Sequence, residues 1–272
     1  STSVEIMKVA AIQFESTPNP TRNRVLLTKA IDAAAEAGAT LIILPEASQR
    51  AFGVIGATLA EDSEDLEGPF VTMLVDRAAR HALHIVAGMF ETAEVGTTPF
   101  NTTVIAGPSG VVGTYRKIHL YDALGFVESE GITAGTVGED NLIVFEAHGF
   151  SVGVMTCFDL RFPEMARALI DRGADVIVLG AAWVPGPRKS EQWRTLLQAR
   201  AIESTAYVIA AGQPGPRYCG GSTIIAPDGS TIAEALPNGM TTITGELDRV
   251  AIAAVRSSMP VLAQRRIGGT QR

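Results

Sequence analysis

Three residues with reactive side chains each stand at the end of an apolar run. Glu46 closes the segment ATLIILPE, Lys117 follows VVGTYR, and Cys157 closes SVGVMTC. In α/β folds, the carboxyl ends of the strands aim such side chains into a common crevice, and the loops that follow leave room for a substrate. We therefore expect the three side chains to meet in space.

Together the three residue types fit the hydrolysis of an amide. A thiol must lose its proton before it attacks an amide carbonyl, and a carboxylate such as Glu46 can accept that proton. The tetrahedral intermediate carries an oxyanion, which a lysine ammonium and a backbone N–H just after the nucleophile stabilise. The same carboxylate would then protonate the departing amine and activate the hydrolytic water.

Taken singly, each residue has a plainer interpretation. Cys157 could be a small buried apolar residue, Lys117 a solvated surface lysine, and Glu46 a helix cap or the partner of an arginine. Only the combination predicts a catalytic site.

The segments that must position these residues are short β-branched runs, apolar on both faces. Such runs are expected of strands covered on both sides, as in α/β folds. Between the first two runs, a helix is predicted near residues 22–37, with Gly38 as its stop. The predicted strands are KVAAIQF, ATLIILPE, LHIVAGMF, TTVIAG, LIVFEA, FSVGVMTCF, ADVIVLGAAW, AYVIAAGQ and STIIAP.

A faint internal repeat relates two of these runs. EAGATLIILPEA, residues 36–47, resembles DRGADVIVLGAA, residues 171–182, and each follows a helix that itself follows a strand. Two β-α-β units of this sort require parallel strands with right-handed crossovers. They predict a sandwich of two similar sheets with helices outside. No linker or low-complexity segment divides the halves, so we expect one domain over residues 1–272.

Composition excludes several classes of function. A net charge of −7 and a pI of about 5.2, without a basic cluster, disfavour nucleic acid as a partner. No apolar run is long enough to span a membrane and no signal peptide is evident, so we expect a cytoplasmic protein. Its two cysteines, Cys157 and Cys219, make no disulfide framework, and its four histidines show no metal-ligand spacing. No metal and no cofactor are expected.

Three segments carry a resemblance to a known family. LIILPEA, YRKIHLYD and GVMTCFDLRFPE are similar to the glutamate, lysine and cysteine motifs of the nitrilase superfamily of carbon–nitrogen hydrolases, in the same order. NTTVIAGPSGVV and QARAIESTAYVIAAGQ match as well, so the resemblance runs from Lys8 to about Arg266. It implies a four-layer α-β-β-α sandwich and a Glu46-Lys117-Cys157 triad.

The resemblance also assigns further residues. The family's second glutamate matches Glu128, which precedes a serine as the family pattern requires, although Glu130 is a nearby competitor. The oxyanion would be bound by the backbone N–H of Phe158, the residue after the nucleophile.

The cysteine motif is similar to that of the Nit branch, which contains ω-amidase and deaminated glutathione amidase. Substrates of that branch carry carboxylates, so a cation is expected in the pocket. Arg161 is the candidate, unless it forms a structural salt bridge, and Trp183 is expected to line the pocket where the branch usually has phenylalanine. The segment VPGPRKSEQW departs from the branch, and its Arg188 and Lys189 add positive charge. We predict an amidase for a small carboxylate-bearing amide, which need not be either named compound.

Two alternatives stay open. The same triad would serve an N-carbamoyl amino acid or β-ureidopropionate hydrolase, and the fold could also be a non-catalytic scaffold. The resemblance implies a homodimer or higher even homo-oligomer, in which the tail from about Met259 crosses to a partner subunit.

Overall fold

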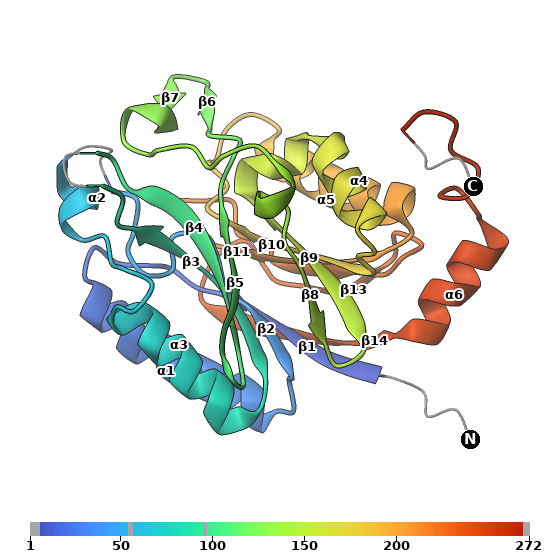
Figure 1. The fold of residues 1–272 in the computed structure, drawn as a ribbon, viewed down its shortest axis with the longest axis horizontal. Helices are drawn as coiled ribbons and strands as arrows, with labels where there is room; N and C mark the ends of the chain where they lie inside the picture. Colours follow the sequence, from blue (N-terminus) through green and yellow to red (C-terminus); the bar gives the residue numbers. More distant parts are fainter. Residues whose placement is uncertain (1–5, 54–56, 95–96, 269–272) are drawn as a thin grey trace.

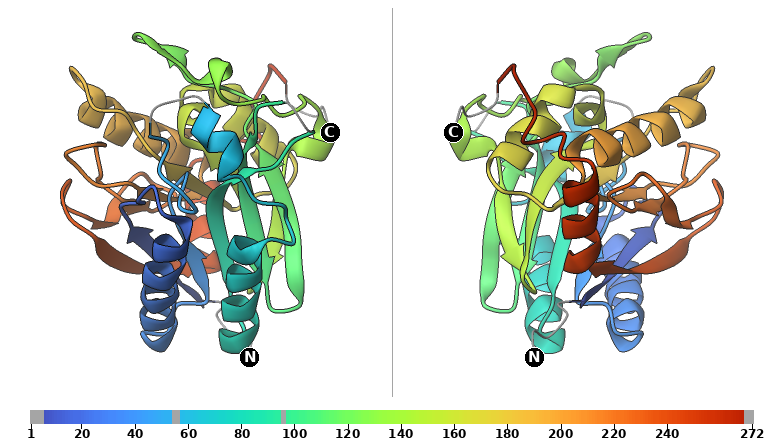
Figure 2. Two further views of the ribbon diagram at one scale, coloured as in Figure 1. Left: turned by 90° about the vertical axis from the view of Figure 1, so that its left-hand side faces the viewer. Right: turned by 90° about the vertical axis from the view of Figure 1, so that its right-hand side faces the viewer.

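The protein is built as two six-stranded sheets that lie face to face, with helices on both outer sides (Figures 1 and 2). The computed structural model describes residues 6–53, 57–94 and 97–268. The predicted four-layer α-β-β-α sandwich is confirmed. Buried apolar side chains from both sheets form one continuous core between the layers, including Val9 and Leu41 from one sheet and Val154 and Val178 from the other.

The first sheet has mixed strand directions and two long helices on its outer face. Helix α1 (Pro20–Glu36) buries Leu27 and Ile31 beside Phe70 and Leu74 of α3 (Pro69–His81). A short helix, α2 (Ala57–Glu61), lies at one end. In spatial order the strands are β14 (Thr241–Asp248), β1 (Ile6–Gln13), β2 (Leu41–Ile43), β3 (His84–Glu91), β4 (Phe100–Gly107) and β5 (Gly110–Arg116).

The second sheet is covered by α4 (Pro163–Asp171) and α5 (Lys189–Ser204). In spatial order its strands are β13 (Thr231–Glu234), β12 (Thr223–Ile225), β11 (Tyr207–Gly212), β10 (Val176–Ala181), β9 (Phe150–Thr156) and β8 (Val144–Ala147). Smaller elements are β6 (Asp122–Ala123), β7 (Phe126–Val127), the 3-10 turns η1 (Glu128–Glu130), η2 (Glu139–Asn141) and η3 (Cys157–Arg161), and α6 (Arg249–Ser258).

The internal repeat seen in the sequence is a structural repeat. β1 pairs in parallel with β2, with Val9 opposite Leu41, and β9 pairs in parallel with β10, with Val152 opposite Val176. A helix crosses over between the strands of each pair, so the two β-α-β units were predicted correctly. Leu41 and Val176 also hold the same place in the two repeated segments.

The start of one helix and the presence of one strand are among the features of the fold that differ from the sequence prediction. Helix α1 begins at Pro20 rather than near Arg22, because the side chain of Asn19 caps it and accepts a 2.9 Å hydrogen bond from the Arg22 N–H. Strand β14 was not predicted. One face of it is exposed, so it alternates polar and apolar residues rather than forming a continuous apolar run.

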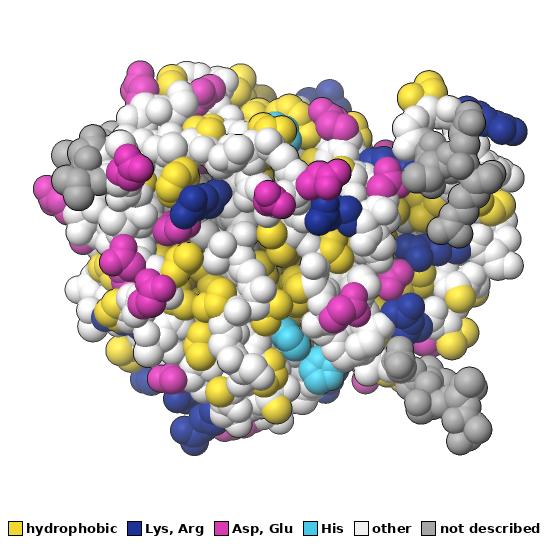
Figure 3. Space-filling model, in the orientation of Figure 1, with side chains coloured by type: hydrophobic (Ala, Val, Ile, Leu, Met, Phe, Trp, Pro, Cys, Tyr) yellow, Lys and Arg dark blue, Asp and Glu magenta, His cyan; other side chains and the backbone are white. Residues whose placement is uncertain are grey.

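Charged side chains of both signs are scattered over the face shown in Figure 3 rather than gathered into one basic area. No helix within the described part of the chain is long and apolar enough to cross a membrane.

Candidate active site

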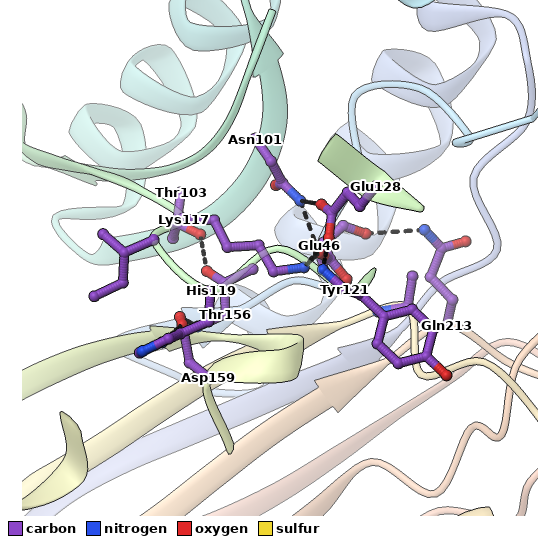
Figure 4. A network of polar contacts seen from close by, with 12 residues as sticks. Glu46, Asn101, Thr103, Lys117, His119, Tyr121, Glu128, Thr156, Asp159 and Gln213 are labelled. Carbon is purple, nitrogen blue, oxygen red and sulfur yellow. Dashed lines mark hydrogen bonds and ion pairs between the residues drawn. The ribbon is translucent and has the colours of Figure 1, made fainter. Parts of the chain in front are cut away.

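The ends of three strands bring Glu46, Lys117 and Cys157 to one cavity. Figure 4 shows Glu46 and Lys117 beside Glu128. Glu46 follows β2, Lys117 follows β5 directly, and Cys157 follows β9. The Lys117 Nζ lies 2.9 Å from Glu46 Oε1 and 2.8 Å from Glu128 Oε2. All three of these charged side chains are only 1% exposed. The sequence-predicted site residues therefore form one buried cluster, which we call the floor: Glu46, Lys117, Glu128 and Cys157.

Two glycines fix the backbone of Glu46 between the sheets. A Cβ on Gly88 of β3 would lie 2.6 Å from the Cα of Glu46, and one on Gly180 of β10 would lie 2.8 Å from its backbone nitrogen. Contacts that short do not occur for real side chains, so both positions need glycine. The Ala182 N–H donates to Glu46 Oε2 at 2.8 Å, and Gln213 Nε2 donates to the Glu46 carbonyl at 2.9 Å. The carboxylate is therefore held in one orientation from several sides.

Asn101 links the two carboxylates of the floor and was missed by sequence reasoning. Its Nδ2 donates to Glu46 Oε1 at 2.8 Å and to Glu128 Oε1 at 3.0 Å. The Tyr121 N–H donates to Glu128 Oε2 at 2.7 Å. Of the two glutamates considered from sequence, Glu128 points into the site, whereas Glu130 is exposed. The sequence could have pointed to Asn101, because it is the first residue of NTTVIAGPSGVV, one of the segments that resemble the family.

Cys157 sits in a sharp turn between β9 and η3. Its φ of +46° lies in the left-handed region, which is uncommon for a residue other than glycine and is often found at functional sites. Burial raises the pKa of its thiol well above the usual range, and the nearby Glu46 carboxylate raises it further, while Lys117 opposes them. The resting thiol is therefore protonated at neutral pH and needs a base.

Lys117 stays charged although it is fully buried. Burial by itself would lower the pKa of its ammonium, but the carboxylates of Glu128 and Glu46 raise it well above its usual value. The floor consequently contains one fixed positive charge between two negative ones.

Asp159 connects the lysine segment to the cysteine turn. It is fully buried, and its Oδ2 accepts hydrogen bonds from the Tyr115 hydroxyl at 2.7 Å and from the Thr156 N–H at 2.8 Å. Its Oδ1 lies 2.7 Å from His119 Nδ1. Tyr115 and His119 flank Lys117 in the sequence, so this network fixes the position of Lys117 relative to Cys157. Sequence reasoning did not find it.

A cavity of about 60 Å³ opens above the floor. Its walls include Phe158, Lys189 at the start of α5, and side chains from three loops: Tyr121, Trp183 and Tyr218. The site is therefore sized for a small molecule. Among the described residues, no group of three or more His, Cys, Asp or Glu is arranged to hold a metal ion.

The sequence profile of the carbon-nitrogen hydrolase family matches residues 8–257. The chain belongs to this family. It is 37% identical over 280 residues to the deaminated glutathione amidase of Escherichia coli O157:H7, covering 97% of this chain and 99% of that protein. It is 29% identical over 272 residues to omega-amidase NIT2-A of Xenopus laevis, covering 95% of each. Saccharomyces cerevisiae Nit3, a member of branch 10 of the nitrilase superfamily, has the same fold with a TM-score of 0.84, at 24% identity over 98% of this chain and 99% of that one.

These similarities confirm the predicted nitrilase-type fold and the relation to the Nit branch. This carbon–nitrogen hydrolase acts on bonds other than peptide bonds, and amidases are among its relatives.

Of the two residues predicted to bind the substrate, Trp183 lines the cavity of this carbon–nitrogen hydrolase. Arg161 is not among the residues that line it. Its guanidinium lies over the Trp183 ring, 4.9 Å from the centroid, and donates to Gln192 Oε1 at 2.8 Å. Besides Lys117 of the floor, the cavity is lined by the cation Lys189, from the segment that departs from the branch pattern. The sequence identified its charge but gave no reason to place it inside the pocket.

Proposed function

We propose that this protein hydrolyses the amide of a small carboxylate-bearing molecule to a carboxylate and ammonia, through a thioester on Cys157. The observation that carries this proposal is the floor, where a buried lysine lies between two buried carboxylates beside the thiol. The small cavity supports a small substrate, and the amidase names of the relatives support an amide.

The first half of the reaction releases ammonia. Glu46 takes the proton from the Cys157 thiol as the sulfur attacks the amide carbon. The Lys117 ammonium and the Phe158 backbone N–H stabilise the oxyanion that forms. Glu46 passes its proton to the nitrogen, the carbon–nitrogen bond breaks, ammonia leaves, and the acyl group remains on sulfur as a thioester.

The second half restores the enzyme. Glu46 removes a proton from water as the water oxygen attacks the thioester carbon, again with Lys117 facing the oxyanion. The carbon–sulfur bond breaks, and the proton on Glu46 returns to the sulfur. Glu128 does not exchange protons in this scheme. It positions Lys117 and balances its charge.

Ammonia release combined with mass spectrometry tests the proposal. Wild-type protein given succinamate or glutaramate should release ammonia and show a transient acyl adduct on Cys157, and Cys157→Ala should show neither while remaining folded. If carbon dioxide is released stoichiometrically from an N-carbamoyl amino acid and no amide is turned over, the protein is a carbamoyl hydrolase instead. If no amide of a panel gives ammonia or an adduct, the scaffold interpretation is favoured.

We also propose that the protein is a single domain that forms a homodimer or higher even assembly in the cytoplasm. Helix α6 and the segment after it expose Val250, Met259 and Ile267, which supports an interface that includes the tail. The last residues of the tail, 269–272, lie outside the described residues. The proposed nucleophile must stay a free thiol, which a reducing compartment maintains. A strictly monomeric sedimentation profile would contradict the assembly.

A further inference from the structure

Lys189 is a buried cation in the cavity wall. It is the first residue of α5 and is only 3% exposed. Its Nζ donates to the Tyr121 hydroxyl at 3.3 Å. The same nitrogen lies 4.8 Å from the centroid of the Tyr121 ring and 4.7 Å from that of Trp183. We call Lys189, Tyr121 and Trp183 the wall.

Lys189 differs from the other buried cations in having no carboxylate partner. Four lysines or arginines are buried among the described residues. Arg50 pairs with Asp62, Arg200 with Glu203 and Lys117 with two glutamates. No ion pair within the described part of the chain includes Lys189. Because a buried charge is costly unless it is paired, and two aromatic rings compensate it only in part, the wall has an unused capacity for one anion.

The helix adds to this positive charge. The backbone dipoles of α5 place partial positive charge at its first turn, where a lysine is disfavoured and an anion is stabilised. The indole of Trp183 donates to the Lys189 carbonyl at 3.0 Å, so ring and ammonium are held together before any ligand arrives. The wall is therefore preorganised for an anion.

The hydroxyl of Tyr121 completes the anion site. Its oxygen accepts the hydrogen bond from Lys189, so its own hydrogen remains available to donate. The backbone N–H of the same residue donates to Glu128 of the floor. Tyr121 thus fixes the distance between wall and floor.

We propose that Lys189 and the Tyr121 hydroxyl bind the carboxylate of the substrate while the floor holds its amide. The proposal rests on the proposed function and adds the two residues that recognise the carboxylate of its substrate. Two carboxylates against one ammonium make the floor repel a substrate carboxylate, so the charged end is directed to the wall. Arg161 contacts the Trp183 ring but does not line the cavity, so we assign it only a positioning role.

Paired substrates of equal length test this assignment. Wild-type enzyme should prefer the half-amides glutaramate and succinamate to the uncharged pentanamide and butanamide. In Lys189→Met, kcat/KM for the half-amides should fall about 10- to 100-fold, the range expected for a hydrogen bond to a charged group, mainly through KM. The kcat/KM for the uncharged amides should stay the same or rise.

Arg188→Met is the matched control. Arg188 is the neighbouring cation of the same loop, but it is exposed and pairs with Glu191, so its removal should leave both substrate classes unchanged. Tyr121→Phe should lose part of the half-amide preference and leaves the Tyr121 backbone contact intact. It also serves as the second test if Lys189→Met does not fold.

The outcomes separate the two proposals. If wild-type enzyme turns over neither kind of amide, the proposed function has failed. If it turns over both, an equal loss on both kinds of amide in Lys189→Met overturns the assignment of the carboxylate site. A selective loss in Arg161→Met, with Lys189→Met unaffected, overturns it in favour of Arg161.

Discussion

The floor and the wall of the cavity each contain a buried lysine, but the surroundings of the two lysines are opposite. Lys117 lies within 2.9 Å of two carboxylates. Lys189 faces two aromatic rings, those of Tyr121 and Trp183, and donates a hydrogen bond to the hydroxyl of Tyr121. The charge of Lys117 is already matched by the protein, so Lys117 can stabilise charge that develops during the reaction without attracting a resting anion. The charge of Lys189 is unmatched, so it suits an anion that the substrate brings. The difference shows how one small site can separate catalysis from recognition.

Of the substitutions considered, Lys117→Met should have the largest effect on both catalysis and stability. We expect kcat to fall about 10²- to 10³-fold and the free energy of unfolding to fall by about 3–5 kcal/mol, because Glu46 and Glu128 would face each other without the ammonium. Thermal unfolding and steady-state kinetics measure the two effects. Lys189→Met removes the same atoms from the wall and should affect stability less.

The pH dependence of stability gives a second measurement on the Lys117→Met variant. Without Lys117, the carboxylates of Glu46 and Glu128 lie buried with no cation between them, and binding of a proton by either one relieves their repulsion. The deficit relative to wild type should therefore shrink as pH falls from neutral. A deficit that is constant with pH would contradict the assigned charges of the floor.

Gly88→Ala should disturb the floor without changing any of its reactive atoms. The added Cβ would lie 2.6 Å from the Glu46 Cα, so the backbone must shift. We expect the free energy of unfolding to fall by about 1–3 kcal/mol and kcat to fall about 10- to 100-fold. The preference for half-amides over uncharged amides should not change. Gly113→Ala is the control, because its nearest neighbour, Ile143 Cγ2, would be 3.5 Å away. Equal effects of both substitutions would argue against Gly88 as the support of Glu46.

The smallest effect concerns the charge of the free enzyme. Because burial and Glu46 raise the pKa of Cys157, the thiol should remain protonated through its ordinary value of 9.0. The difference in ultraviolet thiolate absorbance between wild type and Cys157→Ala should show no step up to that pH. Since the folded pKa is raised, wild type should also lose stability relative to the variant as pH rises past the unfolded value. An increase in thiolate absorbance below pH 9 would mean that the effect of Lys117 on the pKa of Cys157 outweighs that of burial and Glu46.

Sequence alone predicted the fold to a large extent because the layers depend on local patterns. Continuous apolar runs indicate buried strands, and the repeat at residues 36–47 and 171–182 predicted both crossovers. Strand β14 was not predicted because it lies at the edge of its sheet with one face exposed. Its residues therefore alternate between polar and apolar instead of forming a continuous apolar run. The 3-10 turn that carries Cys157 was also not predicted, since its shape depends on Asp159 and Tyr115 from two separate segments.

The sequence by itself determined the family, the order of Glu46, Lys117 and Cys157, and the choice of Glu128, because these depend on residue types within short motifs. Only the tertiary structure decided which cation faces the cavity. Arg161 and Lys189 are equally charged in the sequence, but the direction of each side chain depends on the turn before it and on contacts with distant segments. Arg161 ends η3 and contacts the Trp183 ring without lining the cavity, whereas Lys189 follows the left-handed Arg188, begins α5 and lines the cavity. Both cations contact Trp183, but only Lys189 lines the cavity, so packing rather than charge decides which of them can meet the substrate.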